Sequence, residues 1–191
     1  MDNIKHRKLY KTIMADPPWD INQKGKRGAI RHYDLMTLEQ IKAMPVNDLS
    51  DENAVCFLWV TNSTIDAGHD VLRAWGFEPK SVLTWIKFRP GLGLGMVFRN
   101  NTEHVVVGIK GKYPIAVHNQ PSWFFAPTSD HSHKPEEIFA IAERCYPNPP
   151  FLELFARRRQ LGWDVWGNEI DSDITIPGYP VPSDKNHRKE K

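Results

Sequence analysis

Residues 12–19 read Thr-Ile-Met-Ala-Asp-Pro-Pro-Trp, a short apolar run that leads into an acidic corner stiffened by prolines. The apolar residues are typical of a buried strand, which we expect over residues 9–15. Proline fixes its own φ at about −65° and pushes the residue before it, here Asp16, toward extended geometry. The strand should therefore deliver Asp16 at its carboxyl end, which is the edge where open α/β sheets bind ligands.

Apolar runs and helix-end signals predict the rest of the fold. Residues 54–60, Ala-Val-Cys-Phe-Leu-Trp-Val, fit a strand covered on both faces. Further strands are expected over residues 81–87, 104–109, 151–155 and 165–168. Helices are expected where Thr37 and Gln40 form a capping box, between a cap at Ser63 or Thr64 and Gly76, and from Pro135 to about residue 145. Strands that alternate with helices imply an α/β sheet with helices on both faces.

Composition indicates one cytoplasmic domain. The 191 residues suffice for one sizeable core, and their contents of 40% hydrophobic and 25% charged residues are typical of soluble proteins. We expect a single domain over residues 1–175, followed by a disordered, charged tail over residues 176–191. Cys56 and Cys145 lie in apolar segments and indicate a reducing compartment. No apolar stretch approaches the roughly 18 residues of a membrane span, so no membrane partner is expected.

The corner combines a carboxylate, a rigid turn and an aromatic face, supplied by Asp16, Pro17, Pro18 and Trp19. This set suits the methylation of an amino group conjugated to a ring, because such a nitrogen is a poor nucleophile. A carboxylate and a backbone carbonyl can each accept one N–H bond and aim the lone pair at an electrophilic methyl group. The alternative is an ordinary Asp-Pro-Pro turn followed by a core tryptophan.

Two further charged residues are candidates for ligand binding. Lys134 begins a predicted helix, where a cation is unfavourable unless an anion lies nearby. It could hold a ligand carboxylate together with the helix N-terminus, or be an exposed lysine. Glu153 interrupts an apolar run and is costly there unless it is paired. We favour a structural ion pair with a neighbouring arginine, with a cofactor contact as the alternative.

Basic residues cluster at two places, after the corner and after the late strand. They are Lys24, Lys26, Arg27, Arg31 and His32 in the first cluster, and Arg157, Arg158 and Arg159 in the second. If both clusters flank the edge that carries Asp16, they suit phosphate contacts rather than mere solvation.

Two other patterns are interpreted as lacking the chemistry that they suggest. Residues 91–95, Gly-Leu-Gly-Leu-Gly, are not followed by an amphipathic helix and therefore predict a substrate or partner loop, not a dinucleotide site. His131 and His133 lack further ligands at suitable spacing, so no metal is expected.

The motifs together resemble a known family, the adenine-N6 methyltransferases typified by the seventy-kilodalton catalytic subunit of the mRNA adenosine-methylating complex, with its short bacterial and phage relatives. The likeness covers about residues 10–170. It is carried by Met-Ala-Asp-Pro-Pro-Trp-Asp at 14–20, Phe-Leu-Trp-Val-Thr at 57–61, Trp-Gly-Phe at 75–77, Trp-Ile-Lys at 85–87, Asn-Thr-Glu-His at 101–104, Gly-Ile-Lys-Gly at 108–111, Ser-His-Lys-Pro-Glu-Glu-Ile at 132–138, Glu-Leu-Phe-Ala-Arg at 153–157 and Trp-Asp-Val-Trp-Gly-Asn-Glu at 163–169.

The resemblance implies a Rossmann-like, S-adenosylmethionine-dependent methyltransferase fold with a mixed, mostly parallel sheet. Asp16, Pro17 and Trp19 would hold the target adenine, and a loop containing Tyr33 would gate the base pocket, beside Lys26, Arg27 and Arg31. The resemblance and the charge patterns together assign to the cofactor Asp16, Lys134, Glu153, Phe155, Arg157, Asn168 and Glu169. Of these, Lys134 would contact the cofactor's carboxylate and Phe155 would line its adenine pocket.

Two departures from the larger relatives bear on the cofactor. Only 15 residues precede Asp16, so the upstream strand that carries an acidic adenosine contact is expected to be missing. Residues 158–160 are Arg-Arg-Gln where those relatives have a Pro-His-Asn type of segment.

The leading hypothesis is transfer of a methyl group to the N6 amino group of adenine in nucleic acid. DNA is favoured over RNA because the chain is compact and carries no appended RNA-binding parts. The alternatives are an RNA adenosine methyltransferase and a non-catalytic nucleic-acid-binding subunit, although such subunits usually lose the acidic corner. A protein-glutamine methyltransferase is a further alternative, but those enzymes typically use Asn and Tyr in place of Asp16 and Trp19. A homodimer or a methyltransferase-like partner is also compatible with the sequence.

Overall fold

Seven strands form one sheet within the residues that the computed structural model describes, which are 8–20, 35–88, 97–128 and 133–179. The strands are β1 (Tyr10–Ala15), β2 (Ser50–Val60), β3 (Glu78–Phe88), β4 (Thr102–Lys110), β5 (Trp123–Pro127), β6 (Phe151–Leu154) and β7 (Trp163–Trp166). Their order across the sheet is β5-β3-β4-β2-β1-β6-β7. Neighbours pair in parallel except at β4, which is antiparallel to β2 and β3. The predicted mixed, mostly parallel, Rossmann-like sheet is confirmed.

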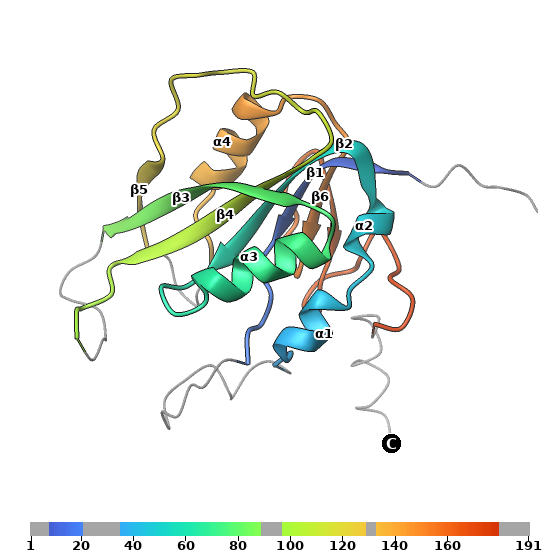
Figure 1. The fold of residues 1–191 in the computed structure, drawn as a ribbon, viewed down its shortest axis with the longest axis horizontal. Helices are drawn as coiled ribbons and strands as arrows, with labels where there is room; N and C mark the ends of the chain where they lie inside the picture. The colour runs from blue at the N-terminus through green and yellow to red at the C-terminus, as the bar shows by residue number, and fades with distance from the viewer. Residues whose placement is uncertain (1–7, 21–34, 89–96, 129–132, 180–191) are drawn as a thin grey trace, which may run out of the picture.

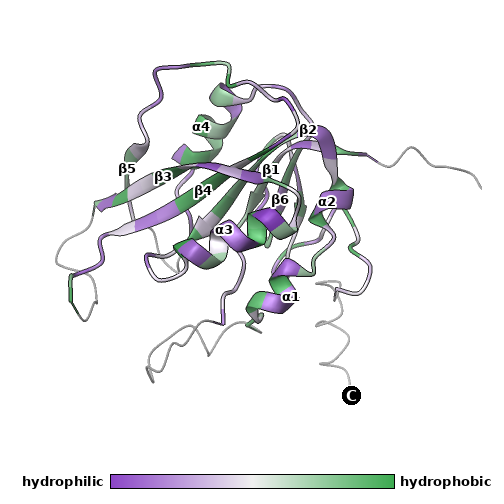
Figure 2. Cartoon of the chain, in the orientation of Figure 1, coloured by the Kyte–Doolittle hydropathy of each residue, from purple (hydrophilic) through white to green (hydrophobic). Residues whose placement is uncertain are grey.

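Helices cover both faces of this sheet, as predicted (Figure 1). On one face lie α1 (Leu38–Lys42), α2 (Val46–Leu49) and α3 (Ile65–Ala74), and on the other lies α4 (Glu137–Cys145). Successive side chains of a strand point to opposite faces, so the apolar run of β2 contributes to two cores. Cys56 and Leu58 pack on the α1–α3 side, while Phe57 and Trp59 pack on the α4 side. Figure 2 shows the hydrophobic residues concentrated on the strands in the middle of the sheet.

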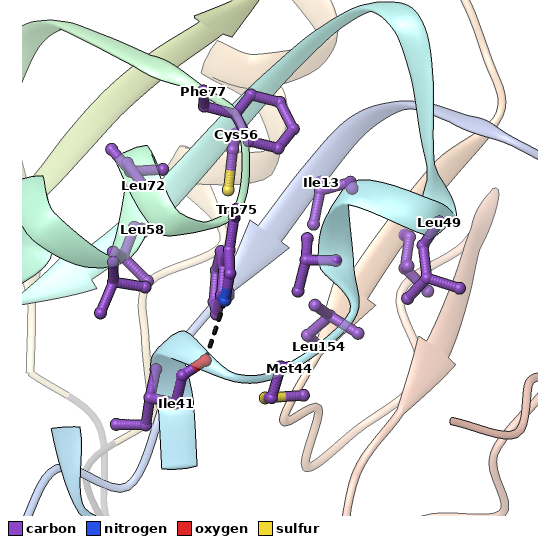
Figure 3. Close-up of a cluster of buried hydrophobic side chains, with 14 of the residues drawn as sticks. Ile13, Ile41, Met44, Leu49, Cys56, Leu58, Leu72, Trp75, Phe77 and Leu154 are labelled. Carbon is purple, nitrogen blue, oxygen red and sulfur yellow. Dashed lines mark hydrogen bonds between the residues drawn. The ribbon is translucent and has the colours of Figure 1, made fainter. Parts of the chain in front are cut away.

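Trp75 anchors the core beneath α1, α2 and α3. Its side chain is fully buried next to Leu58 and Leu72, and its indole Nε1 donates a 2.8 Å hydrogen bond to the carbonyl of Ile41 (Figure 3). That carbonyl lies in the last turn of α1 and also accepts from Met44 N at 3.2 Å. The indole bond therefore satisfies the buried N–H of Trp75 and ties α1 to the end of α3.

Local end signals in the sequence are confirmed at α1 and α3. Thr37 and Gln40 form the predicted capping box, with 3.2 Å from Gln40 N to Thr37 Oγ1 and 2.8 Å from Thr37 N to Gln40 Oε1. Gly76 follows α3 with φ of +83°, a conformation that glycine adopts without a Cβ penalty. Thr64 is the N-cap of α3, but its hydroxyl accepts from Thr61 N instead of capping the helix.

Several predicted element boundaries are wrong. Strand β7 spans Trp163–Trp166 and not residues 165–168, and β2 and β3 begin earlier than predicted, at Ser50 and Glu78. Helix α4 begins at Glu137 with Glu136 as its N-cap, so Pro135 lies before the helix and not at its first position. Strand β6 ends at Leu154, and Phe155 adopts a left-handed φ of +64°. The backbone there turns so that Ala156 N can donate to Trp166 O at 2.9 Å.

The sequence also missed α2 and β5. Strand β5 lies at the edge of the sheet, has only five residues and ends at Pro127, a residue type that is unfavourable in a strand pattern. Helix α2 has only four residues and no side-chain cap, so it offers little periodicity to detect.

Packed structure continues past the predicted domain end at residue 175. Ile176 is 1% exposed in the α1–α3 core, and Tyr179 donates from its hydroxyl to Gln40 O at 3.0 Å. The apolar residues between the prolines thus pack against α1 instead of starting a tail. Residues 180–191 lie outside the described residues. Cys56 and Cys145 are buried free thiols, and no helix in the described ranges is both long and apolar enough to cross a bilayer.

Candidate active site

The site lies at the edge where the strand ends converge. Because β4 runs opposite to the other strands, its first residues lie beside the carboxyl ends of β2 and β3, at the same edge of the sheet as the carboxyl end of β1. Asp16 follows β1, which has β2 on one side and β6 on the other. A chain order that diverges in this way leaves a crevice for ligands at the carboxyl edge. The predicted delivery of Asp16 to this edge is confirmed.

Backbone hydrogen bonds hold the corner that carries Asp16. The Asp16 amide donates to Leu154 O at 3.4 Å, and the Trp19 amide donates to Pro17 O at 3.0 Å. The Met36 amide donates to Pro18 O at 2.8 Å, which ties the corner to the segment before α1. With two prolines and these bonds the corner is ordered before any ligand binds.

Trp19 lies partly on the core and does not line the pockets described below. Its Nε1 donates a 3.1 Å hydrogen bond to Trp59 O, and its ring packs against the α1–α3 core. The indole is half-buried, so both sequence interpretations, a core tryptophan and an aromatic face beside the site, retain support.

Lys134 connects two carboxylates at the edge. Its Nζ lies 3.0 Å from Asp16 Oδ2 and 3.2 Å from Glu103 Oε2. The other oxygen of Glu103, Oε1, lies 2.5 Å from Lys87 Nζ. Four side chains from β3, β4 and the segments after β1 and before α4 thus form one continuous ionic cluster.

Aromatic rings support both lysines of this cluster. Lys134 Nζ lies 5.3 Å from the Trp59 ring centroid, and Lys87 Nζ lies 4.9 Å from that of Trp85. The two rings meet edge to face at 6.1 Å, and Trp85 Nε1 is fixed by a 2.9 Å bond to Ala126 O. Each ammonium therefore gains a cation–π contact on a rigid floor.

The charges of the cluster reinforce one another. Burial alone would raise the pKa of Glu103, but Lys134 and Lys87 hold this pKa below its ordinary value. Burial alone would lower the pKa of Lys134, but Asp16 and Glu103 hold that pKa above its ordinary value. Both side chains are accordingly ionised at neutral pH.

Glu153 differs from these paired carboxylates. Burial, and then the negative charge of Asp16, raise its pKa to about 7, and Arg158 opposes this shift. Its Oε2 is buried and has no hydrogen-bond partner among the described residues. Its Oε2 is therefore available as an acceptor at the first of the two pockets described below, and the structural ion pair that the sequence favoured stays a prediction.

Two adjoining pockets open at this edge and share Asp16, Phe155 and Arg157. The first is completed by His133, Lys134, Phe139, Glu153 and Arg158. The second is completed by Pro18, Ala156, Asn168 and Glu169. The structure thus brings together around one crevice every residue that the sequence assigned to the cofactor.

The end of β7 owes its position to a close backbone approach. A Cβ on Gly167 would lie 1.9 Å from Ala156 O, so only glycine fits there. This approach places Asn168 and Glu169 beside Phe155 on the second pocket. The left-handed φ of Phe155 completes the turn that directs this residue to both pockets.

Of the second basic cluster, Arg157 and Arg158 line the pockets, but Arg159 does not. Arg158 Nη1 lies 3.0 Å from Glu136 Oε1, and Arg159 Nη1 lies 3.0 Å from Asp173 Oδ1. These ion pairs explain the second basic cluster without phosphate contacts at Arg159. Several predictions lie outside the described residues, namely those on Lys24, Lys26, Arg27, Arg31, His32, Tyr33, residues 91–95 and His131.

Sequence reasoning missed Glu103 and Lys87. The available signal was a charged residue near the terminus of each of two strands, Lys87 near the end of β3 and Glu103 near the start of β4. Their meeting depends on the pairing of β3 with β4, where Trp85 lies opposite Glu103.

Comparison with known proteins agrees with this geometry. The fold and the acidic corner define a Rossmann-like α/β domain with its site at the carboxyl edge. A model of the MT-A70 family matches residues 10–169. The chain therefore belongs to the MT-A70 family.

Named relatives match along most of this chain. The Drosophila melanogaster N(6)-adenosine-methyltransferase MT-A70-like protein is 33% identical over 173 residues, which cover 85% of this chain and 27% of that protein. The Homo sapiens N(6)-adenosine-methyltransferase catalytic subunit METTL3 is 31% identical over 180 residues, covering 85% and 28%. The Mycoplasma sp Type II methyltransferase M.MunI is 30% identical over 194 residues, covering 90% and 82%. The chain thus spans little more than a quarter of the first two relatives and most of the third.

Proposed function

We propose that this protein transfers a methyl group from S-adenosylmethionine to the N6 amino group of adenine in nucleic acid, with DNA as the favoured substrate. The observation that carries the proposal is the position of Asp16. It follows β1 directly and lines both pockets, and its carboxylate lies 3.0 Å from Lys134 Nζ.

The residues around the crevice fit the chemistry of S-adenosylmethionine. This cofactor carries a carboxylate, an ammonium, a sulfonium, a ribose and an adenine, and it supplies an electrophilic methyl group. Lys134 suits the carboxylate, and the buried, unpaired Oε2 of Glu153 suits a donor or a cationic group. Phe155 offers a ring for apolar contact, and Asn168 with Glu169 offers polar groups for the nucleoside.

Asp16 and the carbonyl of Pro17 suit the target amine. Each can accept one N–H bond, which holds the nitrogen with its lone pair directed at the methyl group. The Pro17 carbonyl already accepts from Trp19 N, but a carbonyl oxygen has a second lone pair. Alignment by a preformed corner accelerates transfer because the orientational entropy is lost before the reaction. The amine itself attacks, so no covalent enzyme intermediate is needed.

Relatives support the substrate class. Two of them are named N(6)-adenosine-methyltransferases. DNA is preferred to RNA because the relative that the chain covers over most of its length is named a type II methyltransferase and not by the ribonucleoside adenosine. In duplex DNA the adenine would have to be flipped out, at a cost of about a few kcal/mol.

Methyl transfer from tritium-labelled S-adenosylmethionine tests the proposal directly. Adenine-containing DNA and RNA oligonucleotides of the same sequence are compared, and a glutamine-containing peptide serves as the protein substrate. We expect label in DNA, with Asp16→Ala lowering the rate by at least about 100-fold because the amine loses its acceptor. Asp70→Ala is the matched control, because Asp70 lies on the exposed side of α3. Full activity of a folded Asp16→Ala variant, or no cofactor binding by the wild-type chain in calorimetry, would overturn the proposal.

A further inference from the structure

Lys87 and Glu103 lie beside the two pockets without lining them. Glu103 Oε1 lies 2.5 Å from Lys87 Nζ, and Glu103 Oε2 lies 3.2 Å from Lys134 Nζ. One carboxylate therefore bridges two ammonium groups, and it can bind one with each oxygen.

We propose that Glu103, with its charge balanced by Lys87, is the positioning residue that holds the Lys134 ammonium at the crevice and shares it with Asp16. The inference rests on the proposed function, in which Lys134 receives the cofactor's carboxylate. Glu103 itself touches neither cofactor nor substrate and acts through Lys134.

A second carboxylate keeps Asp16 from being the only partner of the Lys134 ammonium. If Lys134 had Asp16 as its only partner, the two would form an exclusive pair that occupies the carboxylate required by the target amine. Glu103 divides the attraction of the ammonium between two partners. Lys87 then cancels the charge of Glu103, so that the cofactor's carboxylate does not meet an additional negative charge.

Burial restricts the positions that the side chains of this cluster can adopt. The side chains of Lys87, Glu103 and Lys134 are 16%, 20% and 20% exposed, so water screens their interactions only in part. The rings of Trp59 and Trp85 lie under the two ammonium groups and limit where they can move. Lys134 is therefore held in place before a ligand arrives, which reduces the ordering cost of binding.

Charged and titratable groups from several elements surround the Lys134 ammonium. Asp16 follows β1, Glu103 lies on β4 and Lys87 on β3. The other charged or titratable groups on its pocket are His133, Glu153, Arg157 and Arg158. Asp16 and Glu103 are the two that contact its Nζ, so a change at Glu103 acts on Lys134 directly.

Glu103→Gln keeps the size of the side chain and removes its charge. We expect the Kd for S-adenosylmethionine to rise by about tenfold or more, as for loss of a charged hydrogen-bond partner. We also expect Lys134 in the ligand-free chain to titrate at lower pH, as followed by NMR of its side-chain nitrogen. The upper pH limit of cofactor binding should fall with it.

A double variant separates positioning from a merely structural ion pair. If Lys87 and Glu103 only stabilise the fold, replacing both with neutral residues should restore wild-type cofactor affinity. A buried ion pair can be exchanged for neutral groups at little cost to stability. If Glu103 positions Lys134, then Lys87→Met combined with Glu103→Gln binds the cofactor as weakly as Glu103→Gln alone. Recovery of wild-type affinity in the double variant would overturn the inference.

Controls keep this outcome separate from that of the proposed function. Glu39→Gln removes the carboxylate of the exposed Glu39–Lys42 pair and should change neither readout. If Glu103→Gln does not fold, Glu103→Asp is measured instead, and it should weaken binding to a smaller extent. An unchanged Kd together with an unchanged Lys134 titration in the folded variant refutes the inference. If the wild-type chain binds no S-adenosylmethionine, the proposed function fails, and the NMR titration still decides the role of Glu103.

Discussion

Gly167 approaches Ala156 so closely that a Cβ at position 167 would lie 1.9 Å from the carbonyl oxygen of Ala156. This contact joins the segments that follow β6 and β7. It therefore determines where Asn168 and Glu169 meet Phe155.

Gly167→Ala is expected to damage the fold and the second pocket together. The added methyl group meets backbone atoms that cannot rotate away, and overpacking of this kind typically costs about 1–3 kcal/mol. Cofactor affinity should fall as well, because Asn168 and Glu169 are displaced. Denaturant unfolding and calorimetry with S-adenosylmethionine measure the two effects. Gly162→Ala is the matched control, since its Cβ would meet nothing within 4 Å and only its φ of +83° adds strain. Equal affinity losses in the two variants would contradict this account.

Glu153→Gln is expected to stabilise the ligand-free chain in a pH-dependent manner. The folded pKa of Glu153 is raised from 4.5 to about 7, so the folded chain binds this proton more tightly than the unfolded chain. The contribution of Glu153 to the free energy of unfolding is therefore fully present below pH 4.5 and is lost as the pH rises through about 7. The variant avoids this loss, and we expect it to gain about 1–3 kcal/mol over wild type at pH 8.

Urea unfolding of both proteins at pH 4.5 and pH 8 tests that expectation. At pH 4.5 the difference between them should nearly vanish, because Glu153 is then largely protonated in the folded wild type. An advantage of the same size at both pH values would show that packing, and not charge, is responsible.

Lys134→Met should destabilise the protein most where its carboxylate partners are ionised. Removing one member of a buried ionic cluster typically costs about 3–5 kcal/mol, and partial exposure here should reduce that to about 2–3 kcal/mol. The folded pKa of Glu103 is lowered, so its stabilising effect exists above its ordinary pKa of 4.5 and is lost as pH falls through the folded value. The gap between variant and wild type should therefore narrow in acid, which thermal unfolding across pH can follow. A gap that is independent of pH would argue against the cluster.

Replacements of Trp19 should separate its hydrogen bond from its aromatic face. Trp19→Phe loses the bond from Nε1 to Trp59 O and should cost about 1 kcal/mol of stability while retaining most of the methyl transfer. Trp19→Ala also loses the ring, so its kcat/KM should fall well below that of Trp19→Phe. Equal activity of the two variants would show that the ring has no role in holding the base.

Local sequence patterns predicted those parts of the fold in which neighbouring residues decide the structure. The apolar run at residues 54–60 is a strand buried on both faces, and the capping box at Thr37 begins a helix. The strand before Asp16 ends where the prolines begin. In each case the signal and the structure that it specifies lie within a few residues.

Features that depend on tertiary pairing could not be predicted in this way. The contact of Lys134 with Glu103 requires β4 to run antiparallel between β2 and β3, and no local pattern states that direction. Ile176 was assigned to a tail because prolines surround it, and only the apolar surface beside α1 explains its burial. The left-handed turn at Phe155 likewise follows from the pairing of Ala156 with Trp166 and not from its own residue type.

The reversed direction of β4 has an evolutionary consequence. Strand β3 ends at Phe88 and β4 begins at Thr102, so the connection between them starts and finishes beside the crevice. Connections between strands generally tolerate insertions and deletions at a low entropic cost. Divergence of that one connection would let descendants of this scaffold acquire new recognition preferences while the sheet and the acidic corner stay unaltered.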